Sequence, residues 1–229
     1  GVVDMRVGDR VAYASVQGAY AEYTIAPADK VVPVPDGLDS RTAAAVLLQG
    51  MTAHYLSHDT FPIQNGQTVL IHAAAGGMGQ LLVQLAKLRG ARVFGTASTE
   101  AKRQQARDVG ADEMFAYDDF DLDVKQLTGG HGVDVVYDSV GLDTFERSLG
   151  CLRPRGYMVF CGQSSGAVAP FDPQILRARG SVFLTRPSLE HYTLSRDELL
   201  YRAEAVYALA AAGKLRVGID RELPLAQAA

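Results

Sequence analysis

A glycine-rich turn, "HAAAGGMGQ" (residues 72–80), is the part of this sequence best suited to chemistry. Gly76 and Gly77 would let the backbone approach a pyrophosphate closely, and Gly79 would let the following helix pack against the preceding strand. Ala74 stands where the usual fingerprint has its first glycine, and alanine can serve there if its φ is negative. The turn therefore favours a dinucleotide-phosphate site, with a plain strand-to-helix connection as the alternative.

The residues after the next apolar run bear on which dinucleotide would bind. NAD-specific sites commonly carry Asp or Glu at the end of the second strand, where the carboxylate binds the ribose 2′-hydroxyl. Here the chain reads Thr96, Ala97, Ser98. Ser98 can donate a hydrogen bond and Lys102 can add a charge-assisted contact, so NADPH is favoured over NADH. Glu100 counts against this unless its side chain points away, and the alternative for Lys102 is an exposed helix lysine.

Other residues of reactive type allow a structural explanation. His54 and His58 are spaced i, i+4 beside Asp59, which could make a metal-binding helix face. A solvated helix surface is preferred, because no third ligand follows at metal-site spacing. Cys151 and Cys161 could in principle form one bridge, but nothing around them resembles a disulfide scaffold. No paired base accompanies either thiol, so both are interpreted as small buried residues.

From residue 68 onward, apolar runs of strand length alternate with helical stretches, and two of the helices should end at Gly90 and Gly110. This alternation predicts a doubly wound parallel sheet with helices on both faces. The predicted strands are "TVLIHA", "ARVFGTA", "VDVVYDSV", "GYMVFCG" and "GSVFLTR", and the helices are "MGQLLVQLAKLRG", "EAKRQQARDVGA" and "DTFERSLGCL". The acidic run "DDFDLD" is expected to be an exposed loop and helix start.

The segments on either side of this region have different sequence patterns. "DRVAYASVQGAYAEYTIA" alternates as short antiparallel strands do. "SRTAAAVLLQGMTAHYLS", from Ser40, predicts a linker helix between two domains. A last helix is predicted from Ser195 to Ala212, opened by a capping box with Glu198 and stopped by Gly213.

Composition narrows the class of protein. The chain has 229 residues, of which 48% are hydrophobic, so a sizeable core can form. The net charge of -4 and the lack of a basic stripe argue against nucleic acid or anionic lipid as main partners. The uncharged stretch 63–86 is interrupted by glycines, Asn and Gln, so no membrane span is expected. The cysteine usage suits a reducing cytoplasm.

Four segments in order, "HAAAGGMGQ", "VYDSVG", "GQSSGA" and "TRPSLEHY", resemble the zinc-independent quinone oxidoreductases of the medium-chain dehydrogenase/reductase superfamily, the group that includes zeta-crystallin. The resemblance covers nearly the whole chain. It implies an α/β fold, a Rossmann-type doubly wound sheet plus part of a GroES-like β-rich catalytic domain. Residues 1–47 would belong to that catalytic domain, 48–187 to the Rossmann domain, and 188–229 to an incomplete return segment.

The resemblance also implies a chain truncated at both ends, so the catalytic residues stay unassigned. NADPH is the implied cofactor. For Tyr117 and Ser139, the alternative to a cofactor contact is a turn or strand-end residue whose side chain is hydrogen-bonded to backbone. No metal is expected, because no cysteine lies between Tyr13 and Ala53 and the position of a zinc ligand in zinc-dependent relatives reads Leu48. The implied cofactor contacts are Thr52 at the linker helix, Gly76, Gly77 and Met78 at the pyrophosphate, Ser98, Lys102 and Tyr117 around the adenosine phosphate, Ser139 near the adenine and ribose, and Cys161, Gly162, Gln163 and Ser164 near the nicotinamide.

The implied activity is metal-free, NADPH-dependent reduction of quinones by hydride or single-electron transfer. One alternative is reduction of α,β-unsaturated carbonyls or enoyl thioesters. Another, of a different class, is an RNA-binding, crystallin-like role, which the acidic balance disfavours. The resemblance further implies a cytoplasmic homodimer that pairs through the edge strand at 181–187.

Overall fold

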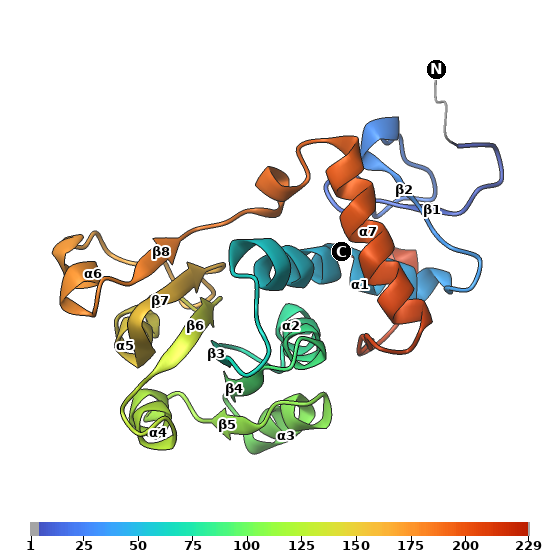
Figure 1. Cartoon of the computed structure of the whole chain (residues 1–229). Coiled ribbons are helices and arrows are strands. Elements are labelled where there is room, and N and C mark those ends of the chain that lie inside the picture. Colours follow the sequence, from blue (N-terminus) through green and yellow to red (C-terminus); the bar gives the residue numbers. More distant parts are fainter. Residues whose placement is uncertain (1–4, 229) are drawn as a thin grey trace. The chain divides into compact units, whose positions relative to one another are not determined.

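The computed structural model describes residues 5–228 and divides them into two compact units (Figure 1). Unit 1 takes in the described residues up to Thr52 and those from Leu189 onward. Unit 2 runs from Ala53 to Ser188. The assignment of residues 1–47 and 188–229 to a GroES-like catalytic domain stays a prediction.

Unit 2 is built on a parallel sheet of six strands in the order β5-β4-β3-β6-β7-β8. The predicted α/β fold with a doubly wound parallel sheet is therefore confirmed. The strands are β3 (Thr68–Ile71), β4 (Arg92–Thr96), β5 (Glu113–Phe115), β6 (Val133–Asp138), β7 (Leu152–Phe160) and β8 (Phe183–Thr185).

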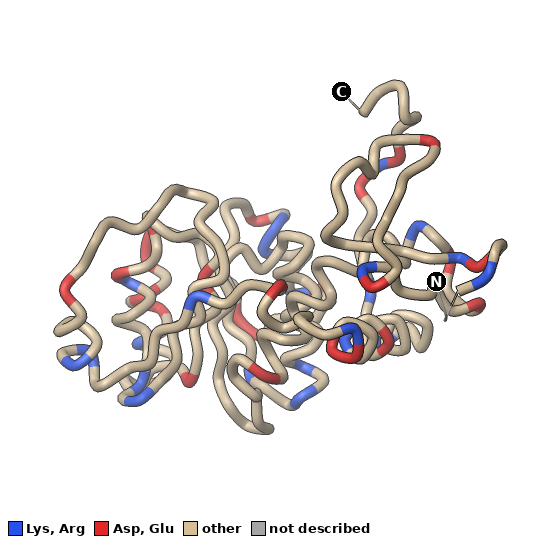
Figure 2. The backbone as a smooth tube through the Cα atoms, turned by 90° about the horizontal axis from the view of Figure 1, so that it is seen from above, with Lys and Arg blue, Asp and Glu red and all other residues tan. Residues whose placement is uncertain are grey.

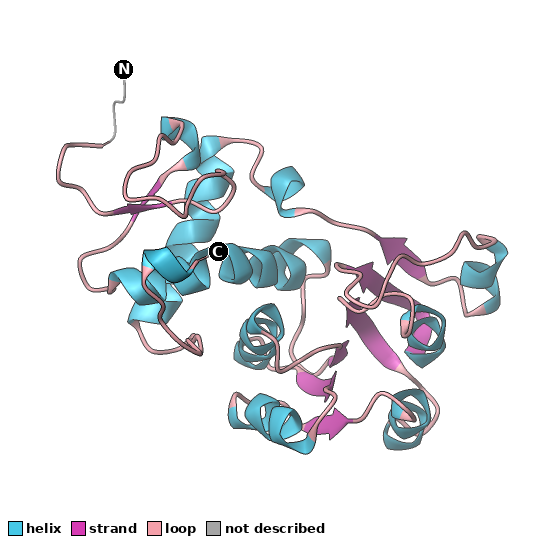
Figure 3. Cartoon of the chain, turned by 180° about the vertical axis from the view of Figure 1, so that it is seen from behind, coloured by secondary structure: helices cyan, strands magenta, loops and turns pink. Residues whose placement is uncertain are grey.

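Helices cover both faces of this sheet, with α2 and α3 on one face and α4 and α5 on the other (labelled in Figure 1 and seen from behind in Figure 3). The chain moves outward from β3 through β4 to β5 and then returns to place β6 on the other side of β3. Ligands of open α/β sheets bind beyond the carboxyl ends of the strands where the winding reverses, which here is between β3 and β6. The helices of unit 2 are α2 (Gly77–Leu88), α3 (Glu100–Asp108), α4 (Phe120–Leu127), α5 (Phe145–Cys151) and α6 (Gln174–Ala178).

The apolar runs form strands because their side chains are buried on both faces of the sheet, and Val69, Leu70 and Ile71 of β3 are fully buried. The helix ends also follow the prediction. Gly90 and Gly110 come just after α2 and α3, with φ of 77° and 112°, which glycine adopts without the steric cost that other residues meet.

Two parts of the sheet prediction need correction. The strand β5 was not predicted, because its three residues "EMF" are too short for an alternating pattern. The strands expected between residues 9 and 26 are largely wrong, since only Val11–Ala12 (β1) forms a ladder, antiparallel to Val32–Pro33 (β2). An alternating sequence forms a strand only where a partner supplies hydrogen bonds, and residues 13–27 have none in the described chain.

Unit 1 holds the linker helix α1 (Ser40–Tyr55), whose end from Ala53 belongs to unit 2, and α7 (Arg196–Ala211). Both helices were predicted, and the capping box of α7 is present. Gly50 lets the two helices approach closely, because a Cβ there would lie 2.6 Å from a methyl of Val206. Short turns complete the described elements: η1 (Ala28–Lys30), η2 (Leu56–Thr60, a π-helical turn in unit 2), η3 (Leu189–Tyr192) and η4 (Leu225–Gln227).

Candidate cofactor site

The glycine turn joins β3 to α2 at the carboxyl edge of the sheet. Gly76 is the N-cap of α2, so the backbone amides that follow it are those a helix leaves without internal acceptors. Such amides, together with the positive end of the helix dipole, suit an anion. Ala74 does not have a positive φ, which satisfies the condition for alanine to replace the first glycine of the fingerprint.

The glycines keep the turn tight. A Cβ on Gly79 would lie 2.3 Å from the carbonyl oxygen of Ala73 and 2.9 Å from Cα of Ala74. A Cβ on Gly76 would lie 3.2 Å from the same carbonyl oxygen. Helix α2 can therefore seat its first turn against the end of β3 only with glycine at 79. Ala73 itself has a φ of 49°, an uncommon left-handed conformation for a residue with a side chain.

A hollow of about 160 Å³ opens beside this turn. Four residues that the sequence predicts as cofactor contacts line it together, namely Gly76, Ser98, Lys102 and Tyr117. The other lining residues are Ala73, Ala75 and Ala97. The hollow combines a glycine backbone, a hydroxyl and an ammonium group, which are donors that suit phosphate oxygens. These residues fit the phosphates of a dinucleotide.

Glu100 does not oppose Lys102 across the hollow. Its carboxylate accepts hydrogen bonds from Arg107 at 2.7 Å and from Arg103 at 2.8 Å. The Arg107 and Arg103 guanidinium groups hold the pKa of Glu100 below its usual value. Within residues 5–228, no carboxylate forms an ion pair with the Lys102 ammonium. Lys102 is exposed and carries the free positive charge of this wall.

Tyr117 and Ser139 both bond to backbone. The Tyr117 hydroxyl accepts a hydrogen bond from the Ala73 amide at 3.2 Å, while its ring lines the hollow. The Ser139 hydroxyl lies 3.5 Å from the His72 carbonyl oxygen, at the limit of a hydrogen bond, and Ser139 does not line the hollow. For Ser139, the alternative of a strand-end residue held by backbone thus fits the geometry as well as a contact with the cofactor does.

The predicted nicotinamide-side residues form a second group, beyond the ends of β6 and β7. The Cys161 amide donates to the Asp138 carbonyl at 2.7 Å, and the Ser164 amide donates to the Ser139 carbonyl at 3.2 Å. Gly162 permits this close approach, since a Cβ there would lie 2.7 Å from the Ser139 carbonyl oxygen. The structure does not place this group, with Gln163, in the hollow.

The remaining predicted contacts do not line the hollow. Gly77 and Met78 belong to the first turn of α2 and do not line it. Thr52 lies in unit 1, where its hydroxyl donates to the Leu48 carbonyl at 2.8 Å. All of these assignments as cofactor contacts stay predictions.

A buried polar network beneath the turn was missed by sequence reasoning. The His72 ring is fully buried, with Nδ1 2.9 Å from the Thr96 hydroxyl and Nε2 2.8 Å from the Ser148 hydroxyl. Asp138 accepts hydrogen bonds from Ser148 at 3.1 Å and from Thr144 at 2.7 Å. Burial lowers the pKa of His72 to about 4, so the ring is neutral at neutral pH.

The cysteines form no bridge with each other. Burial raises the pKa of both Cys151 and Cys161 to about 12, so each remains a thiol at neutral pH. A protonated thiol is a weak nucleophile. The interpretation as a small buried residue is confirmed for Cys151, whereas Cys161 is only partly buried.

The prediction of a solvated surface around His54 and His58 is wrong for His54, which is only 3% exposed. The two rings stack with centroids 4.1 Å apart. Tyr55 at the end of α1 and Leu56 at the start of η2 are also buried, so a histidine at position 54 has no solvent face. Across residues 5–228, no group of three or more His, Cys, Asp or Glu side chains is placed to hold a metal ion.

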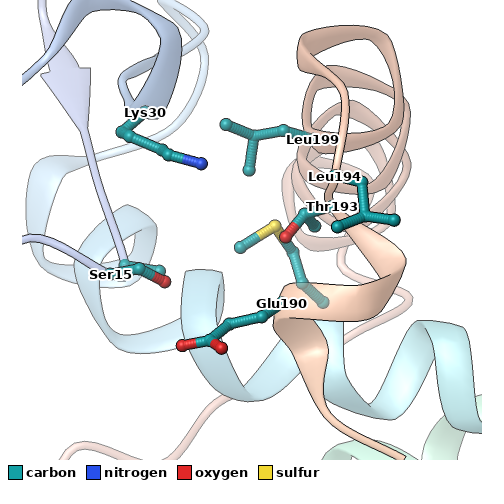
Figure 4. Close-up of a pocket in the computed structure, with 8 residues that line it drawn as sticks. Ser15, Lys30, Glu190, Thr193, Leu194 and Leu199 are labelled. Atoms are coloured by element: carbon teal, nitrogen blue, oxygen red, sulfur yellow. The ribbon is translucent and has the colours of Figure 1, made fainter.

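Unit 1 contains a hollow of its own, of about 330 Å³. Figure 4 shows the Lys30 side chain pointing into it toward Leu199, and the Glu190 carboxylate on the side of Ser15. The apolar residues that line it include Met51, Leu194 and Leu199. None of the residues predicted from the sequence as cofactor contacts lines this hollow.

The six-stranded parallel sheet with a glycine turn entering α2 defines a Rossmann-type nucleotide-binding fold. Residues 77–196 match the family described as zinc-binding dehydrogenase. The chain belongs to this family and, within the medium-chain dehydrogenase/reductase superfamily, to its quinone oxidoreductase branch.

Individual relatives agree with this assignment. The chain is 42% identical to a quinone oxidoreductase of Pseudomonas aeruginosa and 44% identical to a 2-haloacrylate reductase of a Burkholderia species. In each case the match covers 100% of this chain and 71% of the relative. The solved structure of Escherichia coli quinone oxidoreductase complexed with NADPH has a TM-score of 0.93 and 43% identity, covering 96% of this chain and 68% of that one.

Proposed function

We propose that this protein is an oxidoreductase that reduces quinones with NADPH. The observation that supports this most directly is the hollow that gathers Gly76, Ser98, Lys102 and Tyr117 beside the N-terminus of α2. Relatives of this chain include a quinone oxidoreductase of Escherichia coli at 43% identity and a mycobacterial structure complexed with NADPH at 45%. NADPH, when bound, supplies a hydride to an electron-poor acceptor.

The role of this chain is to bind and orient the cofactor. The amides after Gly76 would hold the pyrophosphate, and Ser98 and Lys102 would hold the 2′-phosphate. Thr52, Gly77, Met78, Ser139 and residues 161–164 complete the proposed contacts along the dinucleotide. No side chain is assigned as acid or base, because a quinone can take its protons from solvent. The protein would then accelerate the reaction by positioning the two partners.

Reduction of activated double bonds is the second candidate. It is favoured by the 44% identity with a 2-haloacrylate reductase, a relative as similar as the quinone oxidoreductases. Both reactions deliver a hydride to a carbon framework conjugated with a carbonyl, and they differ in the shape of the acceptor. Turnover should be compared on benzoquinones, linear enones and 2-haloacrylate. Faster turnover of the enone or the haloacrylate would reverse the order of the two candidates.

The cofactor proposal is tested by calorimetric titration of the protein with NADPH and NADH. Wild type should prefer NADPH, and Lys102→Met should weaken NADPH binding at least tenfold while leaving NADH unchanged, since a hydrogen bond to a charged group contributes roughly 1.5–3 kcal/mol. Lys125→Met, an exposed lysine on α4, is the matched control and should change neither affinity. Equal affinity of wild type for the two dinucleotides would contradict the proposed 2′-phosphate site.

Finer features of the family resemblance are proposed as well. The enzyme would act in the cytoplasm without a metal, so dialysis against EDTA should leave turnover unchanged. No helix within residues 5–228 is long and apolar enough to span a bilayer.

The RNA-binding alternative has little support, because acidic and basic residues intersperse along the part of the chain that Figure 2 colours. A gel-shift titration with RNA at low salt should accordingly give no complex.

A homodimer through β8 is the remaining proposal. This strand is at one edge of the sheet, and the Phe183 side chain is 51% exposed there. An exposed apolar edge strand is suited to pairing with a second copy of itself.

A further inference from the structure

One guanidinium group holds the loop between β5 and α4. Arg147, on α5, donates from Nη1 to the carbonyl of Tyr117 at 2.7 Å and from Nη2 to the carbonyl of Asp118. Its Nε donates to Asp121 Oδ1 at 2.8 Å. The same group lies over the Phe120 ring, 4.4 Å from the centroid. Arg147 therefore binds the loop backbone at Tyr117 and Asp118 and the side chains of the first two residues of α4, Phe120 and Asp121.

This loop forms one wall of the hollow beside the glycine turn. The Tyr117 ring lines the hollow, and its hydroxyl accepts from the Ala73 amide at 3.2 Å. Ala73 belongs to the turn and is held at a φ of 49°. A hydrogen-bonded path thus runs from Arg147 through Tyr117 to Ala73. This path links two walls of the hollow, the one at Tyr117 and the one at Ala73.

Arginine is the residue suited to this task. Its planar fork presents donors at fixed angles, so it can bind two carbonyls and a carboxylate at once, which the point charge of lysine cannot. The Arg147 and Asp121 side chains are 35% and 21% exposed. Partial burial reduces the solvent screening that makes fully exposed ion pairs weak.

We infer that Arg147 is a positioning residue that sets the preference for NADPH over NADH, by holding Tyr117 against the phosphate end of the hollow. The inference rests on the proposed function, because it takes the hollow to receive the 2′-phosphate. NADH lacks the 2′-phosphate, so loosening the loop should weaken the binding of NADPH and leave the binding of NADH unchanged. A residue with only a structural role would change the stability of the protein and weaken both dinucleotides alike.

The test is Arg147→Met, which keeps much of the aliphatic stem but removes every donor. We expect the ratio of NADH to NADPH dissociation constants, measured by calorimetry, to fall at least fivefold, with NADH affinity within twofold of wild type. Hydrogen exchange of the amides at 117–121 should become faster in the variant without any dinucleotide present. Arg147→Lys should restore only part of the ratio.

Arg153→Met is the matched control. Arg153, on β7, donates from Nε to Asp134 Oδ1 at 2.7 Å, in a pair as buried as that of Arg147 and Asp121. Asp134 lies at the start of β6, whereas the hollow lies at the carboxyl edge of the sheet. This variant should lower the stability yet keep the wild-type ratio of dissociation constants. Equal loss of the ratio in both variants would overturn the inference.

Further outcomes are equally decisive. A wild-type ratio in Arg147→Met would overturn the inference while leaving the proposed function intact. A wild type that binds NADPH no better than NADH would refute the proposed 2′-phosphate site, and the inference with it. If Arg147→Met does not fold, Asp121→Asn weakens the same clamp more gently. It should shift the ratio in the same direction, and an unchanged ratio would overturn the inference.

Discussion

Gly79 is the most closely packed glycine of the turn, and substitution by alanine tests how much that packing contributes to stability. In Gly79→Ala the new Cβ would meet the Ala73 carbonyl oxygen, so α2 must move away from β3. Overpacking of this kind costs about 1–3 kcal/mol, and we expect a loss of that size in the free energy of unfolding, measured with urea. Gly37→Ala is the control, because nothing lies within 4 Å of that Cβ. Equal stability of the two variants would show that the turn relaxes freely.

At the residue scale, sequence reasoning succeeded where neighbours in the chain carry the signal. Ser98 lies in the connection after β4 and Lys102 lies in the first turn of α3, and both line the hollow. The role of His72 could not be read in this way, because its hydrogen-bond partners Thr96 and Ser148 are 24 and 76 residues away. The clamp formed by Arg147 is another such case, with Tyr117 30 residues distant.

At the scale of elements, hydrophobic periodicity was sufficient for the long units and failed for the short ones. The helices α2, α3 and α7 were predicted from their period, their glycine stops or their capping box. The strand β5 and the helix α6 are three and five residues long, which gives no full period to detect. Order along the sheet could not be read at all, because it depends on contacts between strands far apart in sequence.

The edge strand β8 gives an element-scale prediction. If two copies pair through it, Phe183→Lys places a charge on the shared edge, and we expect a dimer to become a monomer in sedimentation velocity at micromolar concentration. Leu122→Lys is the control, since Leu122 on α4 is an exposed apolar residue of similar degree, at 60%. A wild-type protein that sediments as a monomer would remove the dimer proposal altogether.

The stability of the whole molecule should depend on pH through His72. Its folded pKa of about 4 lies below its ordinary value of 6.5, so the unfolded chain binds the proton more readily. The contribution is complete above pH 6.5 and is lost as the pH falls toward 4. We expect a loss of about 1.5 kcal/mol between pH 6.5 and 5, because the slope approaches about 1.4 kcal/mol per unit only below the unfolded pKa.

The free energy of unfolding is measured with urea at several pH values for wild type and for His72→Gln, whose side chain does not titrate. The carboxylates whose pKa is lowered, Asp39, Glu100 and Glu198, titrate from 4.5 downward when unfolded and add little above pH 5. The difference between the two proteins should therefore flatten above pH 6.5. If the free energy of unfolding changes with pH in the same way for both proteins between pH 7 and 5, His72 does not contribute to the pH dependence of stability.

The glycine absent from position 74 has a counterpart on the neighbouring strand. A Cβ on Gly95 would lie 2.8 Å from the Ala74 methyl and 2.7 Å from Met114 Sδ, so the alanine in the turn is accommodated by the bare backbone of β4. The space that a glycine at 74 would leave is thus provided instead by Gly95 on the neighbouring strand. A side chain larger than glycine at 95 would require both the loss of the Ala74 methyl and a shift of the Met114 side chain, so the residues at 74, 95 and 114 should change together over evolutionary time.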